Sequence, residues 1–331
     1  MLKRRRFLTL SACCAAPTWA HALPSLQPVV WRGVALGALA SMQLVHPDRA
    51  WARAVLARCL DEIERLEGIF SLYRPDSALS RLNASGELRA PPHELVELLS
   101  TSLALARASG GAFDPSIQPL MQLYFRHFAT PGAAPDGPTP AQLARARAAV
   151  GHADIEVASG RIRLLRPGAA LTLNGVAQGF ITDRVAGLLR AAGLTHLLLD
   201  LGEGRAHGRR ADGQPWRASV ADPANPARGL FELRLGSEPG LLPALATSAG
   251  SGTTFDAQAR LHHLLDPASG RSAHFHASVS VAADSATLAD GLSTALSVLP
   301  AERGAALLAQ HAGARAWLVD RHGSVTQIGA S

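Results

Sequence analysis

The segment Leu173-Asn174-Gly175-Val176-Ala177-Gln178-Gly179-Phe180, with Asp183 three places on, has the pattern of a strand that ends at a glycine-bearing turn and continues as a helix. On both sides of this segment, short apolar runs separated by turn residues predict strands. The predicted strands cover 155–157, 162–165, 171–173, 197–201, 216–220, 230–235, 278–283, 315–319 and 324–328. Two helices interrupt them, at 177–190 and 285–299, the second with Asp284 as its expected N-cap. Because hairpin connections outnumber βαβ units, we expect an α+β fold with a mainly antiparallel sheet.

The amino-terminal half of the chain predicts mainly helices. We expect a strand between Val29 and Val45 and then a helix over 46–70, where apolar residues follow the 3.6-residue period. A second helix begins at Pro91-Pro92 and ends at Gly110-Gly111. Residues 130–138 have the composition of a loop, and a single short helix follows over 139–150. This pattern favours an insertion in one domain, 23–331, over a domain boundary.

The first 22 residues have the composition of an export signal. Lys3-Arg4-Arg5-Arg6 precede a short apolar stretch, and Ala20-His21-Ala22 form a small-residue cleavage site. The paired arginines resemble the twin-arginine type of signal, so the sequence predicts a periplasmic protein cleaved after Ala22. A lipoprotein signal is the alternative, because Leu10-Ser11-Ala12-Cys13 resembles the motif that leaves a lipidated Cys13 at the new N-terminus.

Composition excludes several classes of site. With 331 residues, 47% of them hydrophobic, the chain can bury a full core. Its net charge of +6 falls to +2 once the signal's four positive residues leave, so the basic balance is no argument for nucleic-acid binding. Lys3 is the only lysine, which excludes lysine chemistry in the exported body. Cys59 is the only cysteine outside the signal, which excludes an internal disulfide, and its place in an apolar helical stripe predicts a buried structural residue.

Two distant segments together predict a magnesium-assisted pyrophosphate site. The turn at 174–179 can aim helix N-terminal amides at an anion. Far downstream, Asp290 and Thr294 lie four apart on one helix face and offer a carboxylate and a hydroxyl. With the backbone carbonyl near Ala177, they can hold Mg²⁺ against phosphates. An ordinary glycine turn and a solvated polar helix face are the alternatives that remain open. The GxGxxG and GxxxxGK[ST] patterns are absent from the chain.

A few further residues are candidates for chemistry. His262-His263 lie in an expected strand that enters a turn, Asp266-Pro267-Ala268-Ser269-Gly270, and one of the two imidazoles could act as a general base. Asp114 either caps a turn or lines a site, and Tyr73 either stacks on a ligand or packs in the core. No Gly-x-Ser-x-Gly elbow exists, so serine hydrolase chemistry is disfavoured.

Taken together, these segments resemble the ApbE-type FAD:protein FMN transferases. The resemblance covers about residues 33 to 328 and is carried by these motifs in order: Ser71-Leu72-Tyr73 with Ser77 and Asn83, Gly111-Ala112-Phe113-Asp114-Pro115, the 174–183 segment, Gly202-Glu203, Pro215-Trp216, Ala246-Thr247-Ser248, His263-Leu264-Leu265-Asp266-Pro267 with Gly270, and Ala289-Asp290 with Thr294-Ala295.

The resemblance implies a tunnelling-fold-like α+β core and a set of site residues. Mg²⁺ would be held by the Ala177 carbonyl, Asp290 and Thr294, and FAD would be the substrate. Its FMN half would pass to a threonine hydroxyl of an exported partner protein, and AMP would leave. His263 would be the candidate base, with Asp290 also in a catalytic role. The residues expected to contact FAD are Tyr73, Asp114, Asn174, Gly175, Gln178, Asp183, Gly202, Glu203, Ser248 and His263.

This chain departs from the family pattern at two places. Leu36-Gly37-Ala38 stand where the family usually has Met-Gly-Thr, and Gln178 stands where it usually has a lysine. The sequences of the 173–184 segment and of Asp200-Leu201-Gly202-Glu203 are most similar to the NosX branch of the family. This similarity implies a membrane-bound, NosR-like flavoprotein of nitrous oxide reduction as partner. The alternatives are an FAD pyrophosphatase, which would give FMN and AMP, and a periplasmic FAD-binding protein without transfer.

Overall fold

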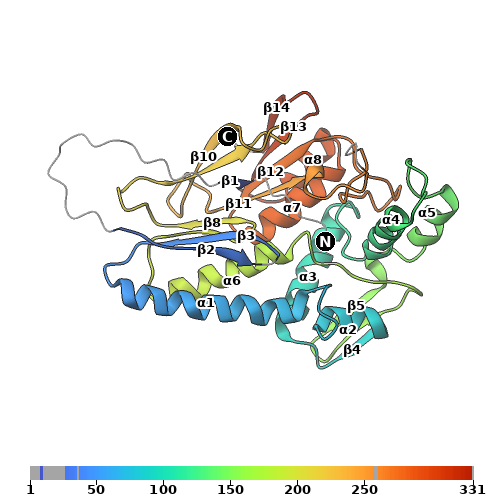
Figure 1. Cartoon of the computed structure of the whole chain (residues 1–331), viewed down its shortest axis with the longest axis horizontal. Coiled ribbons are helices and arrows are strands. Elements are labelled where there is room, and N and C mark those ends of the chain that lie inside the picture. Colours follow the sequence, from blue (N-terminus) through green and yellow to red (C-terminus); the bar gives the residue numbers. More distant parts are fainter. Residues whose placement is uncertain (1–7, 10–26, 36, 257–259, 330–331) are drawn as a thin grey trace.

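A computed structural model describes residues 8–9, 27–35, 37–256 and 260–329. Its centre is an antiparallel sheet of eight strands (Figure 1). The strand order is β14 (Val325–Gly329), β13 (Arg315–Val319), β12 (Ser278–Ala283), β11 (Ala244–Ala249), β8 (Gly204–His207), β7 (Leu197–Asp200), β3 (Ala38–Leu44) and β2 (Val29–Ala35). Every neighbouring pair in this order is antiparallel, which confirms the predicted α+β fold.

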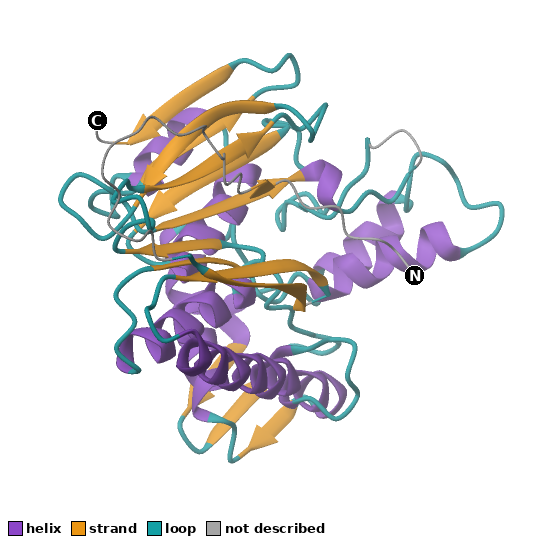
Figure 2. Cartoon of the chain, turned by 60° about the vertical axis from the view of Figure 1, so that its left-hand side comes forward, coloured by secondary structure: helices purple, strands orange, loops and turns teal. Residues whose placement is uncertain are grey.

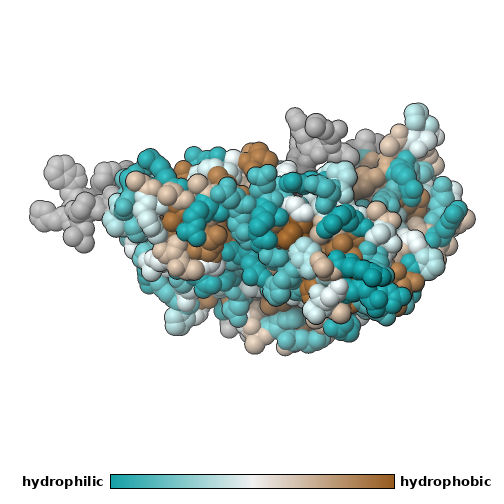
Figure 3. Space-filling view, turned by 90° about the horizontal axis from the view of Figure 1, so that it is seen from below, coloured by the Kyte–Doolittle hydropathy of each residue, from teal (hydrophilic) through white to brown (hydrophobic). Residues whose placement is uncertain are grey.

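Helices cover one face of this sheet. α1 (Arg49–Phe70) and α6 (Ala177–Ala191) run below the strands in Figure 1, and α7 (Ala286–Val298) packs against α6, β11 and β12. α3 (His93–Ala108) contacts α1 and α7, and α8 (Ala301–Leu308) contacts α7, β13 and β14. Seen from below, the surface of the molecule is mainly hydrophilic with scattered apolar areas (Figure 3), as expected where amphipathic helices turn their polar sides to solvent.

The opposite face of the sheet is covered by a hairpin. β9 (Trp216–Ala221) and β10 (Gly229–Leu235) pair antiparallel, and they bury Trp216, Ala218 and Val220 against sheet residues that include Leu198 and Leu245. These sheet residues alternate with the ones that face the helices, because successive side chains of a strand point to opposite faces. The other edge of β9 pairs with β1 (Leu8–Thr9).

Two smaller units flank the central layers (Figure 2). β4 (Glu87–Arg89), β6 (Arg161–Leu164) and β5 (Ile155–Ala158) form a three-stranded sheet, and α2 (Ala78–Ser85) contacts β4. α4 (Gln118–Ala129) and α5 (Pro140–Arg147) form a projecting helix pair around a separate apolar cluster that contains Leu120, Tyr124 and Leu143. The loop expected at 130–138 connects these two helices.

Three local expectations need correction. The expected strand at 171–173 does not form, because the backbone of Leu171 bonds the side-chain amide of Asn83 at 2.7 and 2.8 Å. Asp284 is not the N-cap of α7: the Ser285 hydroxyl accepts from the Leu288 N–H at 3.1 Å instead. The segment at His262 makes only an isolated bridge to Thr254.

The structure contains more strands and helices than the sequence pattern predicts. Val29 to Val45 holds the hairpin β2–β3 where one strand was expected, and Gly37 in its turn has φ +73. From residue 27 onward, the pattern also missed the strands β4, β8 and β11 and the helices α2, α4 and α8. Cys59 is fully buried as expected, and burial raises the pKa of its thiol to about 12.

Most of the expected export signal lies outside the described residues, apart from Leu8–Thr9. Within the described part of the chain, no helix combines the length and the apolar character that crossing a bilayer requires.

Candidate active site

The site begins where α6 and α7 meet. Asp290 of α7 is 4% exposed, and its Oδ2 accepts a hydrogen bond from the backbone N–H of Gly179 at 3.0 Å. Gly179 permits this approach, because a Cβ there would overlap the Ala286 carbonyl and lie 2.8 Å from the Thr287 Cα. The carboxylate of Asp290 is therefore held against the first turn of α6, the helix that begins at Ala177.

Thr294 lies one helical turn beyond Asp290 and contacts the turn that precedes α6. Its Oγ1 lies 3.4 Å from the Gly175 carbonyl oxygen and 3.4 Å from the Ser248 Oγ of β11. A Cβ at Gly175 would come within 2.9 Å of the Thr294 Oγ1, so the glycine leaves this hydroxyl its room. Ser248 also bonds Ser293 at 2.8 Å. Thus three segments far apart in sequence bring a carboxylate, hydroxyls and a backbone carbonyl together.

Two buried polar side chains belong to neighbouring segments. Gln178 follows Ala177 in the first turn of α6, and its Nε2 has no hydrogen-bond partner among the described residues. A buried amide without a partner is costly, so this donor is suited to a ligand. Glu203 is 5% exposed and lies between β7 and β8, where Gly202 takes φ +104. Asn174, by contrast, is exposed and donates its backbone N–H to the Thr172 Oγ1.

Asp183 fastens the start of α7. Its carboxylate accepts from the N–H groups of Ala286 and Thr287 at 3.0 and 2.9 Å and from the Thr287 Oγ1 at 2.6 Å. It also forms an ion pair with Arg205 of β8 at 3.0 Å. Burial lowers the pKa of Arg205, and the charge of Asp183 opposes that shift. The contacts give Asp183 a positioning role, and its expected contact with FAD stays a prediction.

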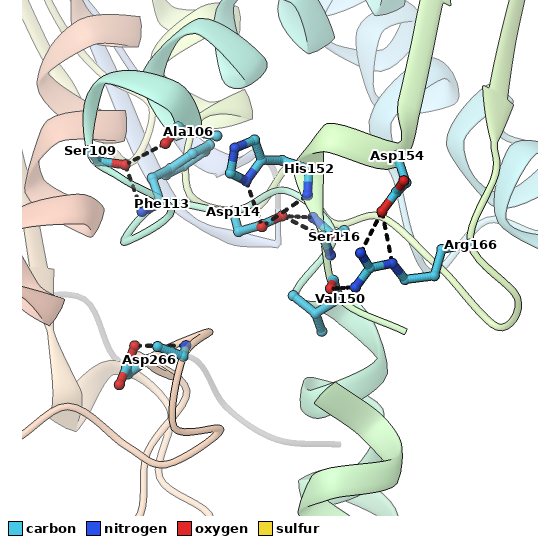
Figure 4. Close-up of polar contacts among 12 residues, drawn as sticks. Ala106, Ser109, Phe113, Asp114, Ser116, Val150, His152, Asp154, Arg166 and Asp266 are labelled. Carbon is cyan, nitrogen blue, oxygen red and sulfur yellow. Dashed lines mark hydrogen bonds and ion pairs between the residues drawn. The ribbon is translucent and has the colours of Figure 1, made fainter. Parts of the chain in front are cut away.

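Asp114 is the centre of a separate buried network (Figure 4). Its Oδ1 accepts from the N–H and the Oγ of Ser116, and its Oδ2 lies 3.0 Å from the His152 Nδ1 and 3.1 Å from the His152 N. The aspartate therefore does cap the turn that follows it. Tyr73, also expected at the site, is 76% exposed, which disagrees with core packing and leaves its ring on the surface.

The two adjacent histidines have different surroundings. His262 is 8% exposed, its Nδ1 lacks a partner among the described residues, and burial lowers its pKa. The His263 Nδ1 lies 3.2 Å from the Thr253 carbonyl oxygen. A carbonyl only accepts, so Nδ1 carries the proton and the basic lone pair of the neutral ring is on Nε2. Asp266 accepts from backbone N–H groups of its own turn, as Figure 4 also shows.

Sequence reasoning missed the residues that fix these candidates. Ser293 bonds Ser248, Arg205 pairs with Asp183, and His152 bonds Asp114. The sequence offered a signal for Ser293, because this hydroxyl residue directly precedes Thr294, which the resemblance assigns to the site. Arg205 and His152 carried none, since each comes from an element whose position depends on the tertiary fold.

The described residues contain no group of three or more histidine, cysteine, aspartate or glutamate side chains that could hold a metal ion. The Asp290 cluster has one carboxylate, so an ion bound there would also need hydroxyl, carbonyl and substrate oxygens.

A model of the ApbE family matches residues 36–318. The chain belongs to the ApbE family. Among curated ApbE relatives, the "FAD:protein FMN transferase" of Vibrio cholerae is 32% identical over 251 residues, or 74% of this chain and 73% of the relative. The protein of the same name from Klebsiella pneumoniae is 28% identical over 305 residues and covers 89% and 84%.

Solved ApbE structures are similar over almost the full length. The apo flavinyl transferase ApbE of Pseudomonas stutzeri superposes with a TM-score of 0.76 at 28% identity, covering 93% of this chain and 97% of that one. The flavin transferase ApbE of Vibrio cholerae gives 0.78 at 25% identity, covering 92% and 97%. The ApbE protein of Thermotoga maritima, at 24% identity and a TM-score of 0.80, supports the fold alone.

Proposed function

We propose that this protein is an FAD:protein FMN transferase, which moves FMN from FAD to a threonine hydroxyl of an acceptor protein and releases AMP. Membership of the ApbE family and the names of the relatives support the reaction class. The observation that carries the proposal is the contact of Asp290 and Thr294 with the glycine turn and first turn of α6. Such a cluster suits a diphosphate, because phosphoryl transfer depends on positioning and charge neutralisation more than on covalent help.

The cluster also fits Mg²⁺. Asp290 offers one buried carboxylate and Thr294 one hydroxyl, which lies 3.4 Å from the carbonyl oxygen of Gly175. With the carbonyl of Ala177 as the proposed third ligand the set is small, and Mg²⁺ commonly takes few protein ligands together with phosphates and water. When bound, the ion would neutralise charge on the diphosphate. The hydrogen bond from the N–H of Gly179 orients the Asp290 carboxylate toward α6.

In the proposed step, the threonine oxygen of the acceptor attacks the phosphorus on the FMN side of FAD. A new phosphorus–oxygen bond forms, the bond to the bridging oxygen breaks, and AMP leaves with that oxygen. The hydroxyl proton passes to His263, whose Nε2 is the basic nitrogen when Nδ1 donates to the Thr253 carbonyl. Gln178, in place of the family's lysine, would give the phosphates a neutral donor through Nε2.

We further propose that Tyr73, Asp114, Gly202, Glu203 and Ser248 line the flavin or adenosine pocket, and that residues 1–22 direct a body of 23–331 to the periplasm. The exposed ring of Tyr73 and the buried carboxyl of Glu203 are compatible with contacts to a ligand that lies at the surface on one side. The acceptor would be another exported protein. The similarity of the 173–184 segment to the NosX branch favours a NosR-like membrane flavoprotein of nitrous oxide reduction.

Intact-mass analysis tests the proposal. The protein is incubated with FAD, Mg²⁺ and a threonine-bearing domain of an exported flavoprotein, and all masses are then measured. An acceptor heavier by one FMN moiety, with AMP in solution, supports transfer. Free FMN and an unmodified acceptor would mean FAD pyrophosphatase activity, and unchanged FAD would mean binding without turnover.

A further inference from the structure

The edge of β9 that faces away from β10 accepts an extended segment. Leu8 pairs with Val220 and Thr9 with Ser219, antiparallel. Among the described residues from 27 onward, no strand pairs with this edge. The partner of this edge is therefore residues 8–9, which belong to the expected export signal, here called the leader (residues 1–22).

This edge is built to bind backbone. One face of β9 packs on the central sheet, where Trp216, Ala218 and Val220 are buried, and one edge of β9 pairs with β10. Its remaining N–H and C=O groups therefore lie in a rigid, extended row. Such a row binds a strand of almost any sequence through main-chain hydrogen bonds, which is how many domains recognise peptides.

The edge also leads to the candidate active site. Ala221, the last residue of β9, packs against Ala249, the last residue of β11. Ala249 follows Ser248, whose Oγ bonds Ser293 and contacts Thr294. Ser248 and Ala249 point to opposite faces of β11, so the β9 edge and the Asp290–Thr294 cluster lie on different faces at the same end of the sheet. A segment laid along β9 would reach the cluster by continuing past Ala221 around that end.

We propose that the free edge of β9 is the docking site for an extended segment of the acceptor protein; this inference rests on the proposed transferase function. The antiparallel pairing of Leu8 with Val220 and of Thr9 with Ser219 predicts the direction in which an acceptor segment would lie along β9. In an antiparallel partner, the residues before the paired segment run toward Ala221 and the site. The target threonine of the acceptor would accordingly precede its docking segment in sequence.

A consequence concerns the unprocessed chain. Residues 8–9 lie on the edge proposed for the acceptor, so this segment would compete with docking for as long as it stays attached. A tethered competitor has a high effective concentration, and its removal frees the edge. Export and cleavage would thus raise the affinity for the acceptor and leave the affinity for FAD unchanged.

Leader variants of the full-length, uncleaved chain test the proposal. The double variant Leu8→Pro/Thr9→Pro removes the N–H groups of β1, whereas Leu8→Val/Thr9→Val keeps its backbone and serves as the matched control. For each protein, the acceptor concentration that half-saturates FMN transfer, the affinity for FAD and the amide hydrogen exchange of 216–221 are measured. A synthetic peptide of residues 4–12 is the competing probe.

We expect the proline variant to need about fivefold less acceptor than the wild type or the valine variant, with the same affinity for FAD. Its 216–221 amides should exchange faster and become protected again when the acceptor or the 4–12 peptide is added. Equal half-saturation in all three proteins, or 216–221 amides that the acceptor leaves unprotected, would overturn the docking proposal. A complete lack of transfer would defeat the proposed function instead, and protection of 216–221 by the acceptor would still report docking.

Discussion

Asp290 of α7 accepts a hydrogen bond from the backbone N–H of Gly179 of α6 at 3.0 Å, across 111 positions of sequence. This bond ties the carboxylate to the start of α6, where Ala177 and Gln178 lie. It depends on the small size of Gly179, which lets the two helices touch through their backbones.

Replacement of Gly179 by alanine should force α6 and α7 apart. The added methyl would overlap the Ala286 carbonyl, and overpacking of this kind costs about 1–3 kcal/mol. Gly187→Ala is the matched control in the same helix, because a Cβ there has no atom within 4 Å, and it should stabilise by about 0.5–1 kcal/mol. Urea denaturation of both variants measures the difference. If Gly179→Ala and Gly187→Ala have equal free energies of unfolding, α6 and α7 can accommodate a methyl group at position 179.

Replacement of Asp183 by asparagine should act through the start of α7. The change removes the ion pair with Arg205, whose side chain is 15% exposed, and weakens the bonds to Ala286 and Thr287. We expect a loss of about 2 kcal/mol, between the values for exposed and fully buried pairs. Thermal unfolding measures this loss, and flavin fluorescence of the folded fraction tests the expected contact with FAD separately. Wild-type stability would contradict the positioning role, and an unchanged affinity for FAD would contradict the contact.

The sequence predicted the helices whose apolar period is long and clear, α1, α3, α6 and α7. It predicted that the 174–179 turn and Asp290 belong to one site from the ligand groups that the two segments offer, and the resemblance pointed to the same pair. Periodicity alone carries no information on which helices touch. The strand at 171–173 failed because the Asn83 side chain, 88 positions away, takes the backbone bonds of Leu171. β8 was missed because Gly204–His207 is short and carries Arg205 and His207, which strands of a core seldom favour.

Replacement of His263 by alanine should lower FMN transfer by about 10²–10⁴-fold, the usual contribution of a positioned base. FAD binding, followed by flavin fluorescence, should change little. His276→Ala is the matched control, because the Nε2 of His276 also bonds a backbone carbonyl, that of Leu299, at 3.0 Å. If both variants transfer FMN at similar rates, His263 is not the base.

His262 should make the fold sensitive to acid. Burial, with a smaller effect of Arg321, lowers its pKa below the usual 6.5, and a backbone bond and Asp256 oppose the shift. The unfolded chain therefore binds a proton at higher pH than the folded one, and stability falls as pH drops through about 6.5. Urea denaturation from about pH 7.5 to about pH 5.5 should show a shallower loss for His262→Leu than for the wild type. An unchanged slope would mean that His262 titrates alike in both states.

The central claim is that Asp290 and the start of α6 jointly hold the diphosphate of FAD for transfer. The most direct measurement is the initial rate of FMN transfer to the acceptor at a series of Mg²⁺ concentrations, for the wild type and Asp290→Asn. The asparagine keeps the shape of the side chain and can still accept from Gly179, so the melting temperature serves as the folding control. We expect the variant to remain folded and to transfer FMN at least about 100-fold more slowly at every Mg²⁺ concentration. A folded Asp290→Asn protein that transfers FMN at the wild-type rate would contradict the account.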